Sequence, residues 1–345
     1  MKRLIILFSI IFYSCSKQDV DAGLTAKEAS LELRSTASEI SADIIKMDES
    51  EGFNGMLDLI ESYIFTSQED EEGNVKLEVS EIFQDFVTGP FSEVSDDEIE
   101  SFDDIKGRYV WNFETETFKK SASDFFIVEF PTEESSENNA EFRINELELE
   151  EFTSDEFKGE YGPKLIDAQL KVDDEEVISL DLKVEWSSDE FPDLVTIDMN
   201  MKPFSLTFGF DDRNAKSSSL LSTLKLNDKT IVEADGYVEF ETERKEEANL
   251  VEGHIIYNNL KVEGKVLVNN DEEEDYDPND FIDVEILIND KKAGDLVVIG
   301  DDDILYIEYP DGQTEEIEIL FEEAIDEIEE FIDRIDEAAE ALEES

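Results

Sequence analysis

The chain has 345 residues, of which 40% are apolar and 10% aromatic, so it has enough apolar side chains to form a sizeable core. Its 94 acidic residues outnumber its 28 lysines and arginines, and the net charge of -66 disfavours binding to nucleic acid or to anionic lipid surfaces. Cys15 is the single cysteine, so no intramolecular disulfide can form and stability must come from the core.

The first fifteen residues have the pattern of a bacterial export signal. Lys2 and Arg3 are followed by the segment 4–13, which is apolar except for Ser9, and then by Ser14 and Cys15. The apolar run is about half the length that a membrane-spanning helix requires. The pattern predicts a signal peptide at 1–14, with Cys15 as the lipid acceptor, and a polar tether at 15–23.

The segment Phe12-Tyr13-Ser14-Cys15 resembles the lipobox of bacterial lipoproteins, and Ser14 to Lys17 resembles lipoproteins of the Bacteroidota. Phe12 departs from the usual leucine. The resemblance implies acylation of Cys15 and anchorage in the outer membrane, at the periplasmic face or the cell surface, with the lipid bilayer as partner. An ordinary secreted signal peptide is the alternative.

Two helices are predicted next, in a helical segment at 24–66. Apolar and small residues between Ala26 and Met47 recur at intervals of three and four, which places them on one helical face. Thr25 and Glu28 have the spacing of a capping box. A second helix is expected at 53–65, and the small residues of the first favour close packing on the protein's own sheet.

The segment 75–320 is expected to form one antiparallel β domain, because apolar residues alternate in short runs separated by turns. Residues 81–104 are ambiguous between loop and short helix. Three hairpins share an Asp or Asn followed by Asp between apolar residues, at Val172–Val177, Leu226–Ile231 and Ile288–Ala293. Strands are expected at 75–79, 107–111, 117–119, 124–130, 142–149, 165–172, 177–186, 194–201, 204–210, 220–226, 231–240, 250–257, 260–268, 281–288, 295–299, 304–309 and 315–320.

An amphipathic helix is predicted at 321–345, from a stripe that runs from Phe321 to Leu342. The fold class is therefore α+β, with a large antiparallel meander sheet, curled or half-barrel, between N-terminal helices and a C-terminal helix. Docking of this last helix on the sheet is favoured over a coiled-coil partner.

Few residues point to catalysis. His254 is the single histidine, and no nucleophile motif accompanies any serine, which argues against a nucleophilic hydrolase. Pairs of carboxylates suitable for a glycoside hydrolase are too numerous to single out one pair.

One acidic loop is a candidate for weak, millimolar-range calcium association. Asp271, Glu273, Asp275 and Asp277 occupy alternate positions, as the first ligands of a calcium loop do. Tyr276 stands where an EF-hand needs glycine, so a solvated acidic loop is the preferred interpretation, as it is for the triplet 301–303. No cofactor is predicted.

Four aromatic residues are candidates for a sugar-binding or peptide-binding platform, although strand aromatics more often belong to the core: Tyr109, Trp111, Phe113 and Trp186.

These observations favour a non-enzymatic, lipid-anchored envelope protein that binds an apolar ligand or an envelope protein between sheet and helix. A structural surface lipoprotein adapted to a saline medium is the first alternative, and an acid-pair glycoside hydrolase is the second.

Overall fold

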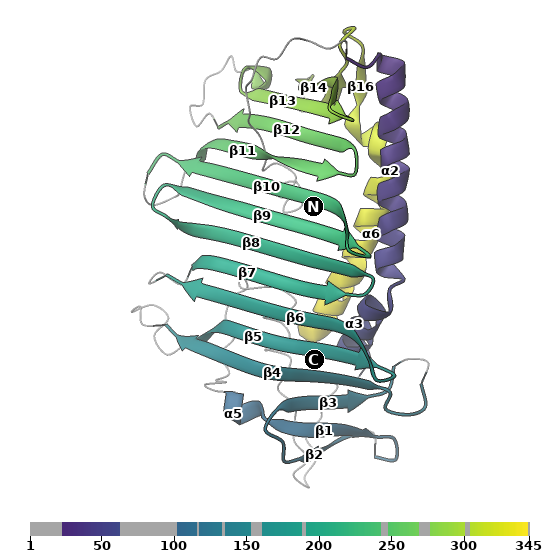
Figure 1. Ribbon diagram of the computed structural model, residues 1–345, viewed down its shortest axis with the longest axis vertical. Coiled ribbons are helices and arrows are strands. Elements are labelled where there is room, and N and C mark those ends of the chain that lie inside the picture. The colour runs from purple at the N-terminus through teal and green to yellow at the C-terminus, as the bar shows by residue number, and fades with distance from the viewer. Residues whose placement is uncertain are drawn as a thin grey trace. The chain divides into compact units, whose positions relative to one another are not determined.

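The protein has the α+β fold class predicted from the sequence, and it is built on one open sheet of sixteen strands (Figure 1). Its strand order is β16-β15-β14-β13-β12-β11-β10-β9-β8-β7-β6-β5-β4-β3-β1-β2, so β16 and β2 are the two edges. This computed structural model describes residues 23–62, 102–115, 117–132, 135–152, 161–187, 191–242, 248–268, 277–300 and 304–343.

The chain forms two compact units. Unit 1 comprises the described residues of 23–45 and 207–329, and unit 2 those of 46–206 and 330–343. Three elements have residues in both units: α2 (Ala26–Asp48), β8 (Phe204–Asn214) and α6 (Ile317–Glu343).

Unit 1 otherwise contains η1 (Pro278–Asp280), β9 (Ser217–Leu226), β10 (Lys229–Phe240), β11 (Ala248–Tyr257), β12 (Leu260–Leu267), β13 (Ile282–Ile288), β14 (Lys291–Ile299), β15 (Ile304–Glu308) and β16 (Thr314–Glu316). Unit 2 contains α3 (Glu51–Ser62), α5 (Phe102–Ile105), β1 (Gly107–Asn112), β2 (Thr117–Ser121), β3 (Phe126–Phe130), β4 (Ala140–Glu151), β5 (Tyr161–Val172), β6 (Glu175–Trp186) and β7 (Pro192–Met201).

Helix α2 begins at the predicted capping box. The Thr25 amide donates to Glu28 Oε2 at 3.0 Å, and the Glu28 amide donates to Thr25 Oγ1 at 3.3 Å. These two bonds satisfy amides that have no partner within the helix. The hydrogen bonds from Thr25 also lower the pKa of the Glu28 carboxyl.

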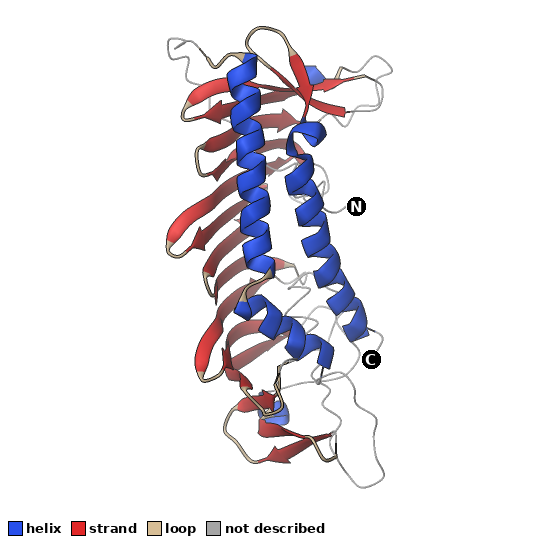
Figure 2. Ribbon diagram, turned by 90° about the vertical axis from the view of Figure 1, so that its right-hand side faces the viewer, coloured by secondary structure: helices blue, strands red, loops and turns tan. Residues whose placement is uncertain are grey.

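In unit 1 the small residues of α2 pack on the sheet, which confirms the prediction from the sequence. Ala26, Ala29 and Leu33 are buried in one cluster with Leu260 of β12 and Ile286 of β13. Figure 2 shows α2 and the first part of α6 side by side over the unit 1 strands. Further members of the cluster are Ile288, Ala293, Ile307, Tyr309 and Leu320.

In unit 2 the second predicted helix is α3, and it also approaches the sheet through small residues. A Cβ at Gly52 would lie 2.7 Å from the Met201 side chain, so the glycine permits this close approach. Phe53 is buried, and its ring centroid lies 4.8 Å from that of Phe331 on α6.

The three predicted hairpins are tight turns with one shared geometry. In each, both central residues have positive φ, between 50° and 66°, as a type I′ turn requires: Asp173-Asp174, Asn227-Asp228 and Asn289-Asp290. A β-bulge follows three residues after each turn, at Val177, Ile231 and Ala293, all of them buried. The arrangement recurs at β5–β6, β9–β10 and β13–β14, every fourth strand, although the spacing along the chain is uneven.

Two details differ from the expectation. Strand β3 pairs with β1 in parallel. It takes the inner position because it carries the buried Phe126 and Phe130. Strand β2, with the exposed Lys119 and Lys120, is therefore left at the edge of the sheet. The last predicted strand ends early: α6 starts at Ile317, and Leu320 is buried as a helical residue. The strand expected at 75–79 lies outside the described residues.

Candidate functional site

The predicted lipid acceptor and three of the four predicted calcium ligands lie outside the described part of the chain: Cys15, Asp271, Glu273 and Asp275. Asp277 is described and caps η1, since its Oδ1 accepts from the Asn279 amide at 3.0 Å. Within the described residues, no three His, Cys, Asp or Glu side chains are grouped as a metal site would require.

The aromatic candidates are not gathered into one platform. The Trp111 ring packs edge-on against Phe118 at 5.2 Å, and the Trp186 ring against Phe152 at 5.1 Å. Trp186 Nε1 also donates to the Pro163 carbonyl at 2.9 Å, and Tyr109 is buried. Trp111 and Trp186 therefore belong to two separate aromatic pairs.

His254 lies in a lattice of ion pairs on the face of unit 1 opposite to the helices, here called the outer face. Its Nδ1 is 3.0 Å from Asp235 Oδ1, across the β10–β11 pair. The same face carries Lys261–Glu263, Lys265–Asp283 and Lys292–Glu285, each joined within 4 Å. Exposed pairs of this kind contribute little individually, and the lattice makes this face polar.

The other face of the unit 1 strands, here called the helix-side face, is apolar and incompletely covered. It is the face on which Val284, Ile286 and Ile288 are buried. Two rows of residues cross it in register, and all six side chains are partly exposed: Ala234, Ile255 and Val262 form one row, and Val238, Val251 and Val266 form the other. These six are called the apolar rows below.

A row of glycines separates the apolar rows. Gly236 pairs with Gly253, and Gly253 pairs with Gly264, on the adjacent strands β10, β11 and β12. These glycines place no side chains between the apolar rows, and Gly236 and Gly264 are buried whereas Gly253 is partly exposed. The only signal of this glycine pairing in the sequence is that Gly253 and Gly264 are equidistant from the predicted turn at Asn258-Asn259.

Helix α6 adds a second apolar surface to unit 1. Leu320 and Ala324 are buried, but Phe321, Ile325 and Ile328 on the same stripe are only partly buried. Unit 1 therefore has partly exposed apolar side chains both on its helix-side face and on a helix that packs there.

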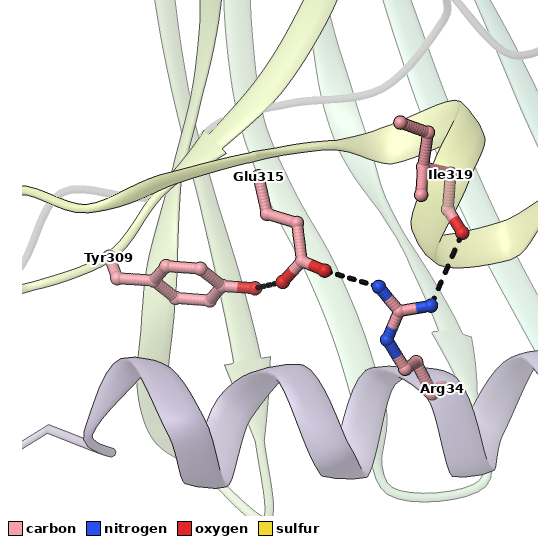
Figure 3. Close-up of polar contacts among 4 residues, drawn as sticks. All are labelled: Arg34, Tyr309, Glu315 and Ile319. Atoms are coloured by element: carbon pink, nitrogen blue, oxygen red, sulfur yellow. Dashed lines mark hydrogen bonds and ion pairs between the residues drawn. The ribbon is translucent and has the colours of Figure 1, made fainter.

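A polar clamp joins α2 to the beginning of α6 and to the last hairpin (Figure 3). Arg34 of α2 forms an ion pair with Glu315 and donates from Nη1 to the Ile319 carbonyl at 3.4 Å, while Tyr309 Oη donates to Glu315 at 2.8 Å. Burial raises the pKa of the Glu315 carboxyl, but hydrogen bonds from Ser30, Tyr309 and Arg34 outweigh it and lower the pKa. Burial and Glu315 raise the pKa of the Tyr309 hydroxyl, which stays a donor.

Carboxylates from α2 lie where β11 ends. Tyr257 follows Ile255 on the same face of β11, and its hydroxyl donates to Asp43 Oδ2 at 2.8 Å. Asn258 Nδ2 donates to Glu39 Oε2 at 3.2 Å, and Lys229 Nζ donates to Asn258 Oδ1 at 3.1 Å. The carboxylates of Asp43 and Glu39 and the ammonium group of Lys229 thus lie at the margin of the apolar rows.

In comparisons with known proteins, no family model, no curated protein and no solved structure matches this chain. None of the described helices is long and apolar enough to cross a bilayer.

Proposed function

We propose that this protein is an exported, lipid-anchored envelope protein that binds an apolar ligand, or the apolar part of a protein partner, without catalysis. One observation carries the binding proposal: the apolar rows on the helix-side face of unit 1 are partly exposed around a row of glycines. Burying such surface on a ligand contributes about 25 cal/mol per Å². The N-terminal signal pattern and Cys15 support the anchor and the outer-membrane location.

A titration with the neutral fluorescent probe N-phenyl-1-naphthylamine tests the binding. The chain without its signal peptide and lipid-acceptor cysteine, residues 16–345, is expected to bind the probe saturably with an increase in fluorescence. Ile255→Glu places a charge in an apolar row, and we expect it to weaken binding about tenfold, as the loss of one buried aliphatic contact would.

Ile256→Glu is the matched control, because Ile256 is the next residue of β11 and faces the outer side. Its affinity is expected to stay within about twofold of the unmodified chain. Unfolding curves establish that both variants are folded. Equal losses in the two variants would show that the probe binds elsewhere.

A structural lipoprotein adapted to a saline medium is the second candidate function. The net charge of -66 and the ion-pair lattice on the outer face favour it. It differs from the first proposal in predicting no saturable probe binding.

A further inference from the structure

The described sheet has two edges, and β2 is the edge that offers backbone groups to a further strand. The other edge, β16, is three residues long, leads directly into α6 and carries Glu315 of the polar clamp. Strand β2 is five residues long, and β1 is its one neighbour in the described sheet. Backbone N–H and C=O groups on the outer side of β2 are therefore available for pairing.

Side chains hold β2 on β1 at both ends of the strand. The ring of Phe118 packs edge-on against Trp111, with 5.2 Å between the ring centroids. Near the other end, Ser121 Oγ donates to the Arg108 carbonyl at 3.3 Å. An incoming strand would therefore meet a preformed edge, which lowers the entropy cost of binding.

The charge of this edge is opposite in sign to the net charge of the chain, which is -66. Strands β1 and β2 together contain Arg108, Lys119 and Lys120 and no acidic residue, and no other two successive strands of the described sheet lack acidic residues. Salt at 0.15 M screens interactions between exposed charges beyond about 8 Å. At that ionic strength the cations of the edge decide which charge it attracts.

Lys119 and Lys120 present this charge on both faces of the sheet edge, because successive residues of a strand point to opposite faces. Both are exposed, and neither forms an ion pair with a described carboxylate. Lys120 Nζ lies 5.0 Å from the centroid of the Tyr109 ring. Arg108 is ion-paired with Glu129 of β3, so the two lysines supply the uncompensated charge.

We propose that β2 binds an extended acidic segment of a protein partner, which joins the sheet as an added strand with carboxylates beside Lys119 and Lys120. Backbone hydrogen bonds to β2 supply the affinity, and the carboxylates select the partner. The same lysines oppose pairing of β2 with β2 of a second copy, because like charges would then face each other. The edge belongs to unit 2 and shares no residue with the apolar rows, so this proposal does not rest on the proposed function.

Four fluorescently labelled peptides of eight residues test the proposal. The acidic peptide, Thr-Val-Thr-Glu-Glu-Val-Thr-Val, places one glutamate on each face of a strand, to match the two lysines of β2. The neutral and basic peptides have Gln-Gln or Lys-Lys in place of Glu-Glu. The fourth is the acidic peptide with N-methyl groups on its four central amides, which keeps the charge and blocks both edges of the peptide. Fluorescence anisotropy measures binding to residues 16–345 in 0.15 M NaCl.

We expect the acidic peptide to bind at least about tenfold more tightly than the basic one, with the neutral peptide between them, because two charges change from attraction to repulsion. The N-methylated peptide is expected to lose at least about tenfold in affinity relative to its parent, because it cannot donate to the carbonyls of β2.

The double variant Lys119→Glu, Lys120→Glu reverses the charge of the edge and should reverse the order, so that the basic peptide binds more tightly than the acidic one. Lys164→Glu, Lys183→Glu is the matched control, since both lysines are exposed but lie on the inner strands β5 and β6. Its order of affinities is expected to stay as in the unmodified chain. Circular dichroism establishes that both variants are folded.

Each contrary outcome overturns a stated part of the proposal. If no peptide binds, the lysines of β2 only protect the edge, and the proposal is wrong. Equal affinities for the acidic, neutral and basic peptides would overturn the acidic partner, and an unchanged affinity of the N-methylated peptide would overturn strand addition. An order that is unchanged in Lys119→Glu, Lys120→Glu would overturn the assignment to β2.

Discussion

Gly264 shows how one residue decides the geometry of the helix-side face. Its φ is +154°, and a Cβ built there would lie 2.1 Å from the Asp283 carbonyl oxygen and 2.7 Å from the Val284 Cα. No side chain fits in that space, because both contacts are with backbone. The neighbouring Gly253 has a φ of +155°. Glycine at positions 253 and 264 is therefore a requirement of the strand geometry.

We predict that Gly264→Ala lowers the free energy of unfolding by about 2 kcal/mol or more, since the strand must move or adopt a strained conformation. Denaturant unfolding measures the change. Gly209→Ala is the matched control, because a Cβ on Gly209 of β8 meets no atom within 4 Å. Equal effects of the two substitutions would contradict the steric explanation.

The clamp at Glu315 predicts a pH dependence. The pKa of Glu315 in the folded protein is lower than its ordinary value of 4.5, so its contribution to stability is complete above about pH 4.5 and is lost as the pH falls through the folded pKa. The stability difference between the unmodified chain and Glu315→Gln should therefore shrink as the pH is lowered below 4.5.

Urea unfolding at a series of pH values measures this difference. Glu318→Gln is the control, since Glu318 is exposed in the first turn of α6. If the difference in free energy of unfolding between the unmodified chain and Glu315→Gln stays constant from pH 6 to the lowest pH at which the protein folds, the clamp is not its source.

At the scale of elements, each of the three bulged hairpins combines one turn type with one bulge. The turn brings the strands back with the right twist, and the bulge places two consecutive side chains toward one face. Val177 and Ile178 are both buried, and so is Ala293 beside Gly294. The backbone carbonyls of two bulge residues also accept hydrogen bonds. The Val177 carbonyl accepts from the Lys202 amide, and the Ile231 carbonyl accepts from the Asn258 amide; both donors are the first residues of the next turn on that side.

We predict that Asn289→Val destabilises the β13–β14 hairpin by about 1–2 kcal/mol, because a β-branched residue is strained at a φ of 50°. Asn289→Gly should be neutral within about 0.5 kcal/mol, because glycine adopts this conformation freely. Thermal unfolding compares the two variants. A valine variant as stable as the glycine variant would argue that the turn conformation is not essential.

Several elements could be predicted from the sequence because their signals are local. The capping box at Thr25 and Glu28 and the Asn-Asp and Asp-Asp turns determine their own backbone geometry. Which strands pair with each other depends on residues far apart in the chain. The turn residues therefore could not predict that β3 pairs with the inner side of β1. At 315–320 the alternation suits both a strand and the first turn of a helix, and packing of Leu320 in the unit 1 core decides for the helix.

Less of the candidate site than of the fold could be predicted from the sequence. The predicted fold class indicates an apolar surface between sheet and helix, but it does not indicate which residues form that surface. Its residues follow from strand register, which sets Ile255 beside Val262 and Gly253 beside Gly264. The contact of Asp43 with Tyr257 joins residues 214 positions apart, and no sequence pattern indicates it.

For the whole molecule, the dominant quantity is the net charge of -66. Repulsion among so many carboxylates opposes compaction, and salt screens it over a Debye length of about 8 Å at 0.15 M ionic strength. The ion pairs of the outer face use only a small part of the acidic residues. Stability should therefore depend on salt more steeply than in an ordinary protein.

We predict that the melting temperature rises by about 5 °C or more between 0.02 M and 0.5 M NaCl. Choline chloride at the same ionic strength should give an equal rise if screening is the cause. A larger rise in calcium chloride of equal ionic strength would instead indicate specific cation binding. A melting temperature that is constant or falls with NaCl would contradict the electrostatic account.

Native mass spectrometry of the protein, extracted mildly from its producing host, would show whether the helix-side face of unit 1 binds an apolar ligand. We expect an additional mass in the range of a lipid-like molecule, present with the unmodified chain and with Ile256→Glu and lost with Ile255→Glu. A polypeptide mass with no added ligand, or a ligand retained equally by Ile255→Glu, would contradict it.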